Sequence, residues 1–174
     1  MTVVVSDNGS PSLSATQFFQ VTVRKWVACQ VSLLDFAGPL GNGDGRRAVA
    51  FAATGGSFPE RRTQTLDFVT GLGSCSVAVP PDTTHLSAKT AWSLRKKVAV
   101  TLNGTQEEAN FTGASALPAG DLDESNTVDL GDYLILAGAW YTSNPVADLD
   151  GSGWVDLEDY FLLASHWNEI GEPE

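Results

Sequence analysis

The stretch DLDESNTVDLGDYLILAGAW at residues 121–140 returns 27 residues later as DLDGSGWVDLEDYFLLASHW at residues 148–167, and 12 of the 20 aligned positions are identical. In both copies, oxygen-bearing residues stand at positions 1, 3, 5, 9 and 12, and valine stands at position 8. A 12-residue loop uses this spacing to wrap oxygen ligands around a calcium ion. The apolar spacing that follows predicts a helix leaving each loop. The sequence therefore contains two copies of one loop-plus-helix unit.

Each loop is expected to supply five side-chain ligands and the main-chain carbonyl of position 7. Position 6 requires a positive φ, which Gly153 adopts freely and Asn126 tolerates. The alternative, two acidic turns in which aspartate caps a helix, needs one aspartate per turn and does not explain five oxygen positions. We therefore predict two bound Ca²⁺ ions. The predicted ligands are Asp121, Asp123, Ser125, Thr127 (carbonyl), Asp129 and Asp132 in the first loop, and Asp148, Asp150, Ser152, Trp154 (carbonyl), Asp156 and Asp159 in the second.

Two features separate the repeat from an ordinary EF-hand. Position 12 is aspartate rather than glutamate, and the segments before the loops, Leu117-Pro118-Ala119-Gly120 and Thr142-Ser143-Asn144-Pro145, are not helix interiors. A duplicated calcium loop with only an exiting helix resembles the type I-like F-hand repeat of the dockerin family, over residues 120–168. The resemblance implies a small all-α dockerin with two calcium loops and two antiparallel helices, and it implies a cohesin-like domain as partner.

Apolar residues on the two helices extend beyond one helical face, which suggests a binding surface. The residues outside that face are Leu130, Leu134, Ile135, Leu157, Phe161 and Leu162. The dockerin resemblance adds Gly131, Gly138, Glu158 and Ser165, at positions where that family contacts cohesin. The alternative is that this apolar surface packs against the rest of the same chain.

Residues 24–116 contain short apolar runs separated by glycine, proline and asparagine turns, which is typical of an antiparallel β-sandwich. The runs are Val27–Leu34, Ala48–Ala53, Thr65–Val69, Ser74–Val79, Ala91–Leu94 and Lys97–Leu102. Upstream, Val3-Val4-Val5-Ser6-Asp7-Asn8-Gly9-Ser10-Pro11 resembles the end of a cadherin-like or immunoglobulin-like domain. We thus expect an α+β multi-module chain: the hairpin of a preceding domain (1–23), a β-sandwich (24–116), a linker (117–120) and a dockerin (121–170).

The net charge of −11 is concentrated at one end, because residues 120–174 carry 13 acidic residues and no lysine or arginine. Such a surface disfavours nucleic acid, and a bound cation would offset the repulsion. No apolar stretch has the roughly 18 residues that a membrane span requires, and no signal peptide precedes the first strand. We expect a piece of a larger exported protein, at an extracellular or cell-surface location, with the export signal outside this chain.

Several weaker signals leave alternatives open. Cys29 and Cys75 either form one disulfide or remain two separate thiols. The basic groups Arg46-Arg47, Arg61-Arg62 and Arg95-Lys96-Lys97 are either solvated strand edges or contacts for the acidic repeats.

The leading hypothesis is a non-catalytic, calcium-dependent docking module that attaches an extracellular protein to a cohesin-like receptor, in the context of polysaccharide degradation. The alternative is a carbohydrate-binding β-sandwich capped by the calcium repeats, which requires exposed and coplanar Trp26, Trp92 or Trp154. A hydrolase would need a catalytic motif around His85, and none is present, so we predict that the chain is not an enzyme.

Overall fold

The computed structural model describes residues 2–6, 9–10, 14–18, 23–34, 36–38, 41–56, 59–104 and 107–174. Seven of its strands form one sheet, in the order β8-β7-β4-β5-β6-β3-β9. The strands are β3 (Lys25–Ser32), β4 (Gly45–Thr54), β5 (Glu60–Val69), β6 (Leu72–Val79), β7 (His85–Lys89), β8 (Lys96–Ala99) and β9 (Glu107–Phe111), and a short 3₁₀ turn, η1 (Gly113–Ser115), follows the last of them.

The sheet is mostly antiparallel, but its last pair is parallel: β9 lies beside β3, with Val27 opposite Glu107 and Val31 opposite Phe111. The two edge strands β8 and β9 also lie against each other, so the sheet is nearly closed. Closing a sheet removes exposed edges and encloses a core on its inner face. In β3 the inward face is plain in the sequence, because Val27, Cys29 and Val31 are buried and alternate with exposed residues.

These observations correct the predicted fold class. The chain is not an α+β multi-module protein with an antiparallel β-sandwich followed by a separate all-α dockerin. It is mostly β, it has one nearly closed seven-stranded sheet, and its described residues contain only two short α-helices. The prediction failed because the spacing of turns and apolar runs locates strands along the chain without saying which strands pair.

The strand positions explain part of this error. The expected run Ala91–Leu94 is a turn ending in an isolated bridge, in which Ser93 pairs with Ala119. The strand of this region is β7, which ends five residues before Leu94 and was not among the expected runs. β9 was also missed, because its sequence EEANF shows little of the usual strand composition.

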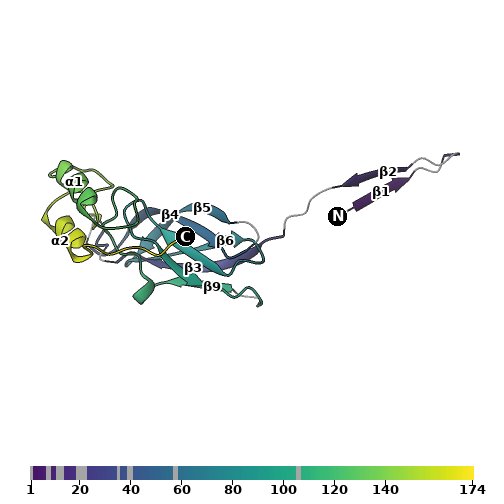
Figure 1. The fold of residues 1–174 in the computed structure, drawn as a ribbon, viewed down its shortest axis with the longest axis horizontal. Coiled ribbons are helices and arrows are strands. Elements are labelled where there is room, and N and C mark those ends of the chain that lie inside the picture. Colours follow the sequence, from purple (N-terminus) through teal and green to yellow (C-terminus); the bar gives the residue numbers. More distant parts are fainter. Residues whose placement is uncertain are drawn as a thin grey trace.

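The two helices are α1 (Leu130–Gly138) and α2 (Leu157–Ser165), and they lie together at one end of the sheet (Figure 1). Each begins with the same capping box, in which the Asp129 or Asp156 carboxylate caps the first turn and the aspartate three residues later reaches back to the capping residue. The repeat in the sequence is therefore a repeat in space. After α2 the chain runs back along the sheet, and the C-terminus of the chain lies beside the strands (Figure 1).

A single hydrophobic core connects the sheet to the repeats. The expected linker is part of it, because Leu117 and Ala119 are fully buried, and Leu136 of α1 and Leu163 of α2 belong to the same cluster as the sheet residues. Leu117 also exchanges backbone hydrogen bonds with β3 and the residues after it, at 2.9 Å. The helices and loops are thus anchored on the sheet by shared apolar burial.

The N-terminal segment forms its own two-stranded antiparallel sheet from β1 (Thr2–Ser6) and β2 (Ser14–Phe18). The hairpin agrees with the turn-rich sequence between the two strands. Its assignment to a preceding cadherin-like or immunoglobulin-like domain remains a prediction. So does the division of the chain at residues 23, 116, 120 and 170.

Candidate metal centre and docking surface

The first loop folds around two buried carboxylates at its ends. Asp121 is fully buried, and its Oδ2 accepts a hydrogen bond from the backbone N–H of Asn126 at 3.0 Å. Asp132 is fully buried as well: its Oδ1 accepts from the backbone N–H of Leu122 at 2.6 Å, and its Oδ2 accepts from that of Asp129 at 2.7 Å. Position 12 therefore ties the beginning of the loop to the beginning of α1.

The second loop repeats this geometry. Asp148 Oδ2 accepts from the backbone N–H of Gly153 at 3.0 Å, and Asp159 accepts from Leu149 at 2.6 Å and from Asp156 at 2.8 Å. Position 6 has a positive φ in both loops, 68° at Asn126 and 101° at Gly153, as the sequence required. The two loops therefore have the same internal hydrogen bonds despite different residues at positions 4, 6, 7 and 11.

In each loop three carboxylates converge. Oxygen atoms of Asp121, Asp123 and Asp132 lie within 4.8 Å of one another, and so do those of Asp148, Asp150 and Asp159. The Oδ1 atoms of Asp121 and Asp148 are buried and have no hydrogen-bond partner. An unpaired buried acceptor beside like charges is costly, and a hard cation would remove both costs. These oxygen donors therefore fit a calcium ion in each loop.

The acid–base properties of the clusters agree with this fit. Burial raises the pKa of Asp121 and Asp159, and it raises the pKa of Asp148 to about 6. Asp123 behaves in the opposite way, because a hydrogen bond from the backbone N–H of Ser125 lowers its pKa. Without a cation, the folded loops thus hold some of their carboxylates in surroundings that disfavour the charge.

The remaining predicted ligands fall into two groups. Ser125 Oγ donates to the carbonyl of Thr127 at 3.1 Å, and Ser152 Oγ donates to that of Trp154 at 3.2 Å, so positions 5 and 7 lie side by side in each loop. Asp129 and Asp156 are not in the converging clusters. They cap α1 and α2 instead, accepting from the backbone N–H two residues later at 2.7 and 3.1 Å.

Sequence reasoning missed the cations that the sheet places beside the loops. Lys89, the last residue of β7, is 8% exposed, and its Nζ contacts Asp121 Oδ2. Arg47 of β4 lies against the second loop: its guanidinium carbon is 4.8 Å from the centre of the Phe36 ring, and both side chains surround Gly151. The only signal in the sequence was the expectation that basic groups such as Arg46-Arg47 contact the acidic repeats.

Other basic groups hold the C-terminal end. Arg61 and Arg95 both form ion pairs with Glu174, and the backbone N–H of Lys97 donates to the Glu172 carboxylate. The backbone N–H of Glu172 in turn donates to the carbonyl of Arg95 at 2.9 Å. These contacts attach the residues after α2 to β5 and β8, which favours the interpretation of these basic residues as contacts for the acidic end of the chain.

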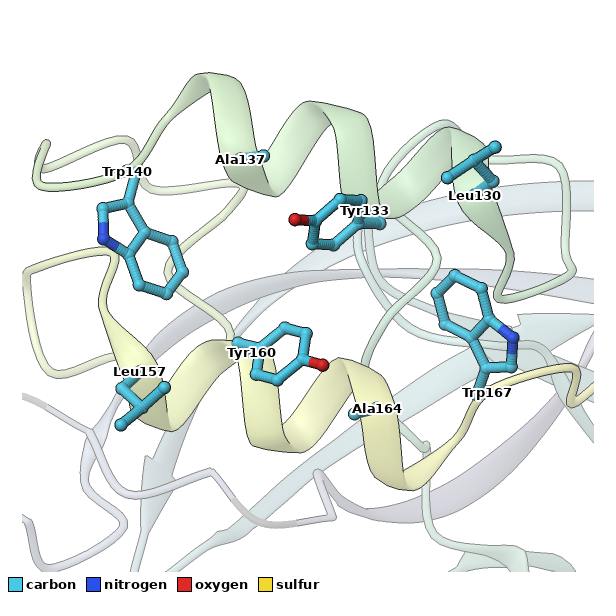
Figure 2. Close-up of a pocket in the computed structure, with 8 residues that line it drawn as sticks. All are labelled: Leu130, Tyr133, Ala137, Trp140, Leu157, Tyr160, Ala164 and Trp167. Carbon is cyan, nitrogen blue, oxygen red and sulfur yellow. The ribbon is translucent and has the colours of Figure 1, made fainter.

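The two helices run antiparallel and leave an open apolar groove between them (Figure 2). The Tyr133 and Tyr160 rings meet at its middle, edge to face, with centroids 6.2 Å apart. Trp140 and Trp167 lie at its two ends, so the groove has approximate two-fold symmetry (Figure 2). Its volume is about 770 Å³, and its lining residues are Leu130, Tyr133, Ala137, Trp140, Leu157, Tyr160, Ala164 and Trp167.

The predicted partner surface is largely exposed. The exposed members are Leu130, Leu134, Ile135, Gly138, Leu157, Glu158, Phe161 and Ser165, while Gly131 and Leu162 are half-buried. Leu130 and Leu157 also line the groove. The helical spacing of the four groove aromatics and two alanines puts them on one face of each helix, and this pattern alone predicts a closed seam between the helices. The sequence pattern placed them on the facing sides without showing that the seam stays open.

The tryptophans that would form a sugar-binding platform do not share one environment. Trp92 is buried, with its ring stacked on Phe36 at 6.4 Å, whereas Trp26 and Trp154 are exposed. A platform of stacked rings that includes Trp92 is therefore ruled out. No described helix has the length and apolar character needed to cross a membrane.

Comparison with known proteins identifies similar structures but no sequence family. No family model matches the chain, and no curated protein matches it either. Similar folds occur in chains of two crystal structures of the Coh3ScaB–XDocScaA complex, a type II cohesin–X–dockerin complex from Acetivibrio cellulolyticus. One is an N-terminal interface mutant (TM-score 0.54, 19% identity, 83% of this chain and 97% of that chain), and the other is a C-terminal interface mutant (TM-score 0.53, 20% identity, 84% and 97%).

At this level of identity the similarity concerns the fold. It shows that the mostly β architecture described above also occurs in chains from cohesin–dockerin complexes. The comparisons give no support to a carbohydrate ligand.

Proposed function

We propose that the C-terminal repeats bind two calcium ions and that the helix pair they support docks this chain onto a cohesin-like protein domain. The role is attachment rather than catalysis. The observation that carries the proposal is the pair of buried, unpaired Oδ1 atoms of Asp121 and Asp148, two residues that each belong to a converging carboxylate cluster. Calcium would compensate the charge of each cluster and fix the start of the helix that follows it.

The docking role rests on the groove between α1 and α2. Open apolar surface with aromatic side chains is characteristic of protein-binding sites, and aromatic residues supply much of the affinity of such sites. The similar structures come from complexes that contain both a cohesin and a dockerin. The two calcium loops favour the dockerin role for this chain, so that the partner is a cohesin. Millimolar calcium, as found outside cells, would keep the loops filled, which favours an extracellular location.

The calcium part of the proposal is tested by calorimetric titration of calcium into the metal-stripped chain. We expect two ions per chain. Asp148→Asn removes one carboxylate charge at nearly constant shape, and we expect it to abolish or strongly weaken one of the two sites. The matched control is Asp67→Asn, because Asp67 is an exposed aspartate of β5 that pairs with Arg46. Absence of binding at millimolar calcium would contradict the proposal.

The docking part is tested by measuring binding of the full chain to the type II cohesin and, separately, to the dockerin of the Acetivibrio cellulolyticus complex. We expect calcium-dependent binding to the cohesin only. Trp167→Ala, at one end of the groove, should weaken it by about 30-fold, as for an interface tryptophan worth about 2 kcal/mol. Trp26→Ala is the matched control, because Trp26 is 66% exposed on β3, outside the groove. Binding to the dockerin instead would assign the chain the opposite role.

A further inference from the structure

The two loops are nearly identical in sequence but differ in the charges around them. Lys89 reaches the first loop from β7 and is 8% exposed. Its ammonium group contacts Oδ2 of Asp121, the same oxygen that accepts the hydrogen bond from Asn126. Lysine is rarely buried without a charged partner, and here the partner is the position-1 carboxylate of the first loop. The other oxygen of that carboxylate, Oδ1, is the unpaired atom.

The second loop has a different neighbour. Arg47 packs over the Phe36 ring, and its Nη1 donates a hydrogen bond to the backbone carbonyl of Arg46 at 2.9 Å. In the described part of the chain, Asp148 forms no direct ion pair, although the positive charge of Arg47 attracts its carboxylate from a greater distance. This loop is also held by neutral contacts: the backbone N–H groups of Ala37 and Gly38, which lie between β3 and β4, both donate to the Asp150 carbonyl at 2.8 Å. The position-1 carboxylate of the second loop is therefore compensated less than that of the first loop, which is in direct contact with an ammonium group.

This difference has two consequences for a divalent cation, and both act in the same direction. In the first loop the ammonium compensates part of the carboxylate charge before any metal binds, so less is gained on binding. Once bound through Oδ1, the metal also shares one carboxylate with a fixed positive charge in a buried site, where charge repulsion is poorly screened. In the second loop both effects are weaker, because Arg47 acts on Asp148 only from a distance.

We propose that Lys89 makes the two calcium sites unequal, so that the loop of residues 148–159 binds calcium at least tenfold more tightly than the loop of residues 121–132. Lys89 acts as a built-in cation that holds the first loop folded at low calcium and lowers its affinity. The inference rests on the proposed calcium-binding function. It adds a filling order, second loop first, to two sites that the sequence presents as equivalent.

The test is calcium titration of the full metal-stripped chain and of four variants. The wild-type chain should show two separable binding steps, with dissociation constants at least tenfold apart. Lys89→Met keeps the apolar stem and removes the charge, and it should tighten the weaker step by at least tenfold while leaving the tighter step unchanged. Lys25→Met is the matched control, because Lys25 lies on β3 and its ion pair is with Glu107. It should change neither step.

Two further variants assign the steps to loops without altering Lys89. Asp150→Ala should remove the tighter step, and Asp123→Ala should remove the weaker one. If Lys89→Met does not fold, these two variants still show which loop binds calcium more tightly. Equal affinities in the wild-type chain, or loss of the tighter step in Asp123→Ala, would overturn the inference while leaving the proposed function intact. Absence of any calcium binding would instead overturn the proposed function, and the inference with it.

Discussion

Replacing Gly151 with alanine tests whether the second loop is packed on the sheet as the structure shows. Gly151 is at position 4 of its loop and has a φ of 76°, a left-handed conformation that costs a residue with a side chain about 1–2 kcal/mol. An added Cβ would lie 2.3 Å from Phe36 Cε2 and 2.9 Å from Arg47 Nη2. The Phe36 ring is held by Trp92 and Phe68, at centroid distances of 6.4 and 6.1 Å, and it has little room to move.

Gly153→Ala separates the two contributions to this cost. Gly153 also has a positive φ, 101°, but no atom lies within 4 Å of its added Cβ. We therefore expect Gly153→Ala to lower the free energy of unfolding by about 1–2 kcal/mol. Gly151→Ala should lower it by about 2–5 kcal/mol, since overpacking adds about 1–3 kcal/mol.

Urea denaturation of both variants at saturating calcium measures this difference. Thermal unfolding gives a second estimate, because about 1 kcal/mol corresponds to about 2–4 °C in a chain of this size. Equal losses in the two variants would refute the packing of the loop against Phe36 and Arg47. Such a result would mean that the repeats and the sheet are not one packed body.

Three further predictions follow from other parts of the structure. Leu136→Ala should lower the free energy of unfolding by about 2–5 kcal/mol in urea denaturation, because Leu136 is fully buried in the core shared by helix and sheet. In the calcium-free chain, burial raises the pKa of Asp148 from 3.8 to about 6. Between these pH values the folded state binds more protons than the unfolded state, so the free energy of unfolding should fall by up to about 3 kcal/mol as the pH rises from 3.8 to about 6. Denaturation at several pH values with a chelator measures this loss, and saturating calcium should remove it. The free thiols of Cys29 and Cys75 face each other across β3 and β6 on the core side. We therefore expect a small-molecule disulfide to oxidise them to an intramolecular disulfide, which mass spectrometry after alkylation would detect. Two alkylated thiols would contradict this prediction.

The two aspartate-rich loops are the part of the site that the sequence predicts best, because their geometry is local. The converging aspartates, the positive φ at position 6 and the start of each helix all depend on residues within 12 positions of one another. The fold was predicted poorly for the opposite reason. Pairing of β9 with β3 joins residues about 80 positions apart, and no feature of EEANF identifies its partner strand. For the same reason Lys89 was missed as a neighbour of the first loop, and for Arg47 contact with the acidic repeats was only one of two alternatives.

The open groove shows how the sheet changes the meaning of the helical pattern. Apolar residues at the spacing i, i+3, i+4 and i+7 predict one face, and two such faces on adjacent helices predict a closed seam. Here each face is divided: Leu136 and Leu163 enter the core shared with the sheet, while the tyrosines and tryptophans face the gap between the helices. Because Leu136 and Leu163 pack in the core of the sheet, the helices are anchored there without packing closely against each other. Anchoring and the proposed docking therefore depend on different residues of one stripe, so we expect substitution of Trp167 to weaken partner binding while leaving the core intact.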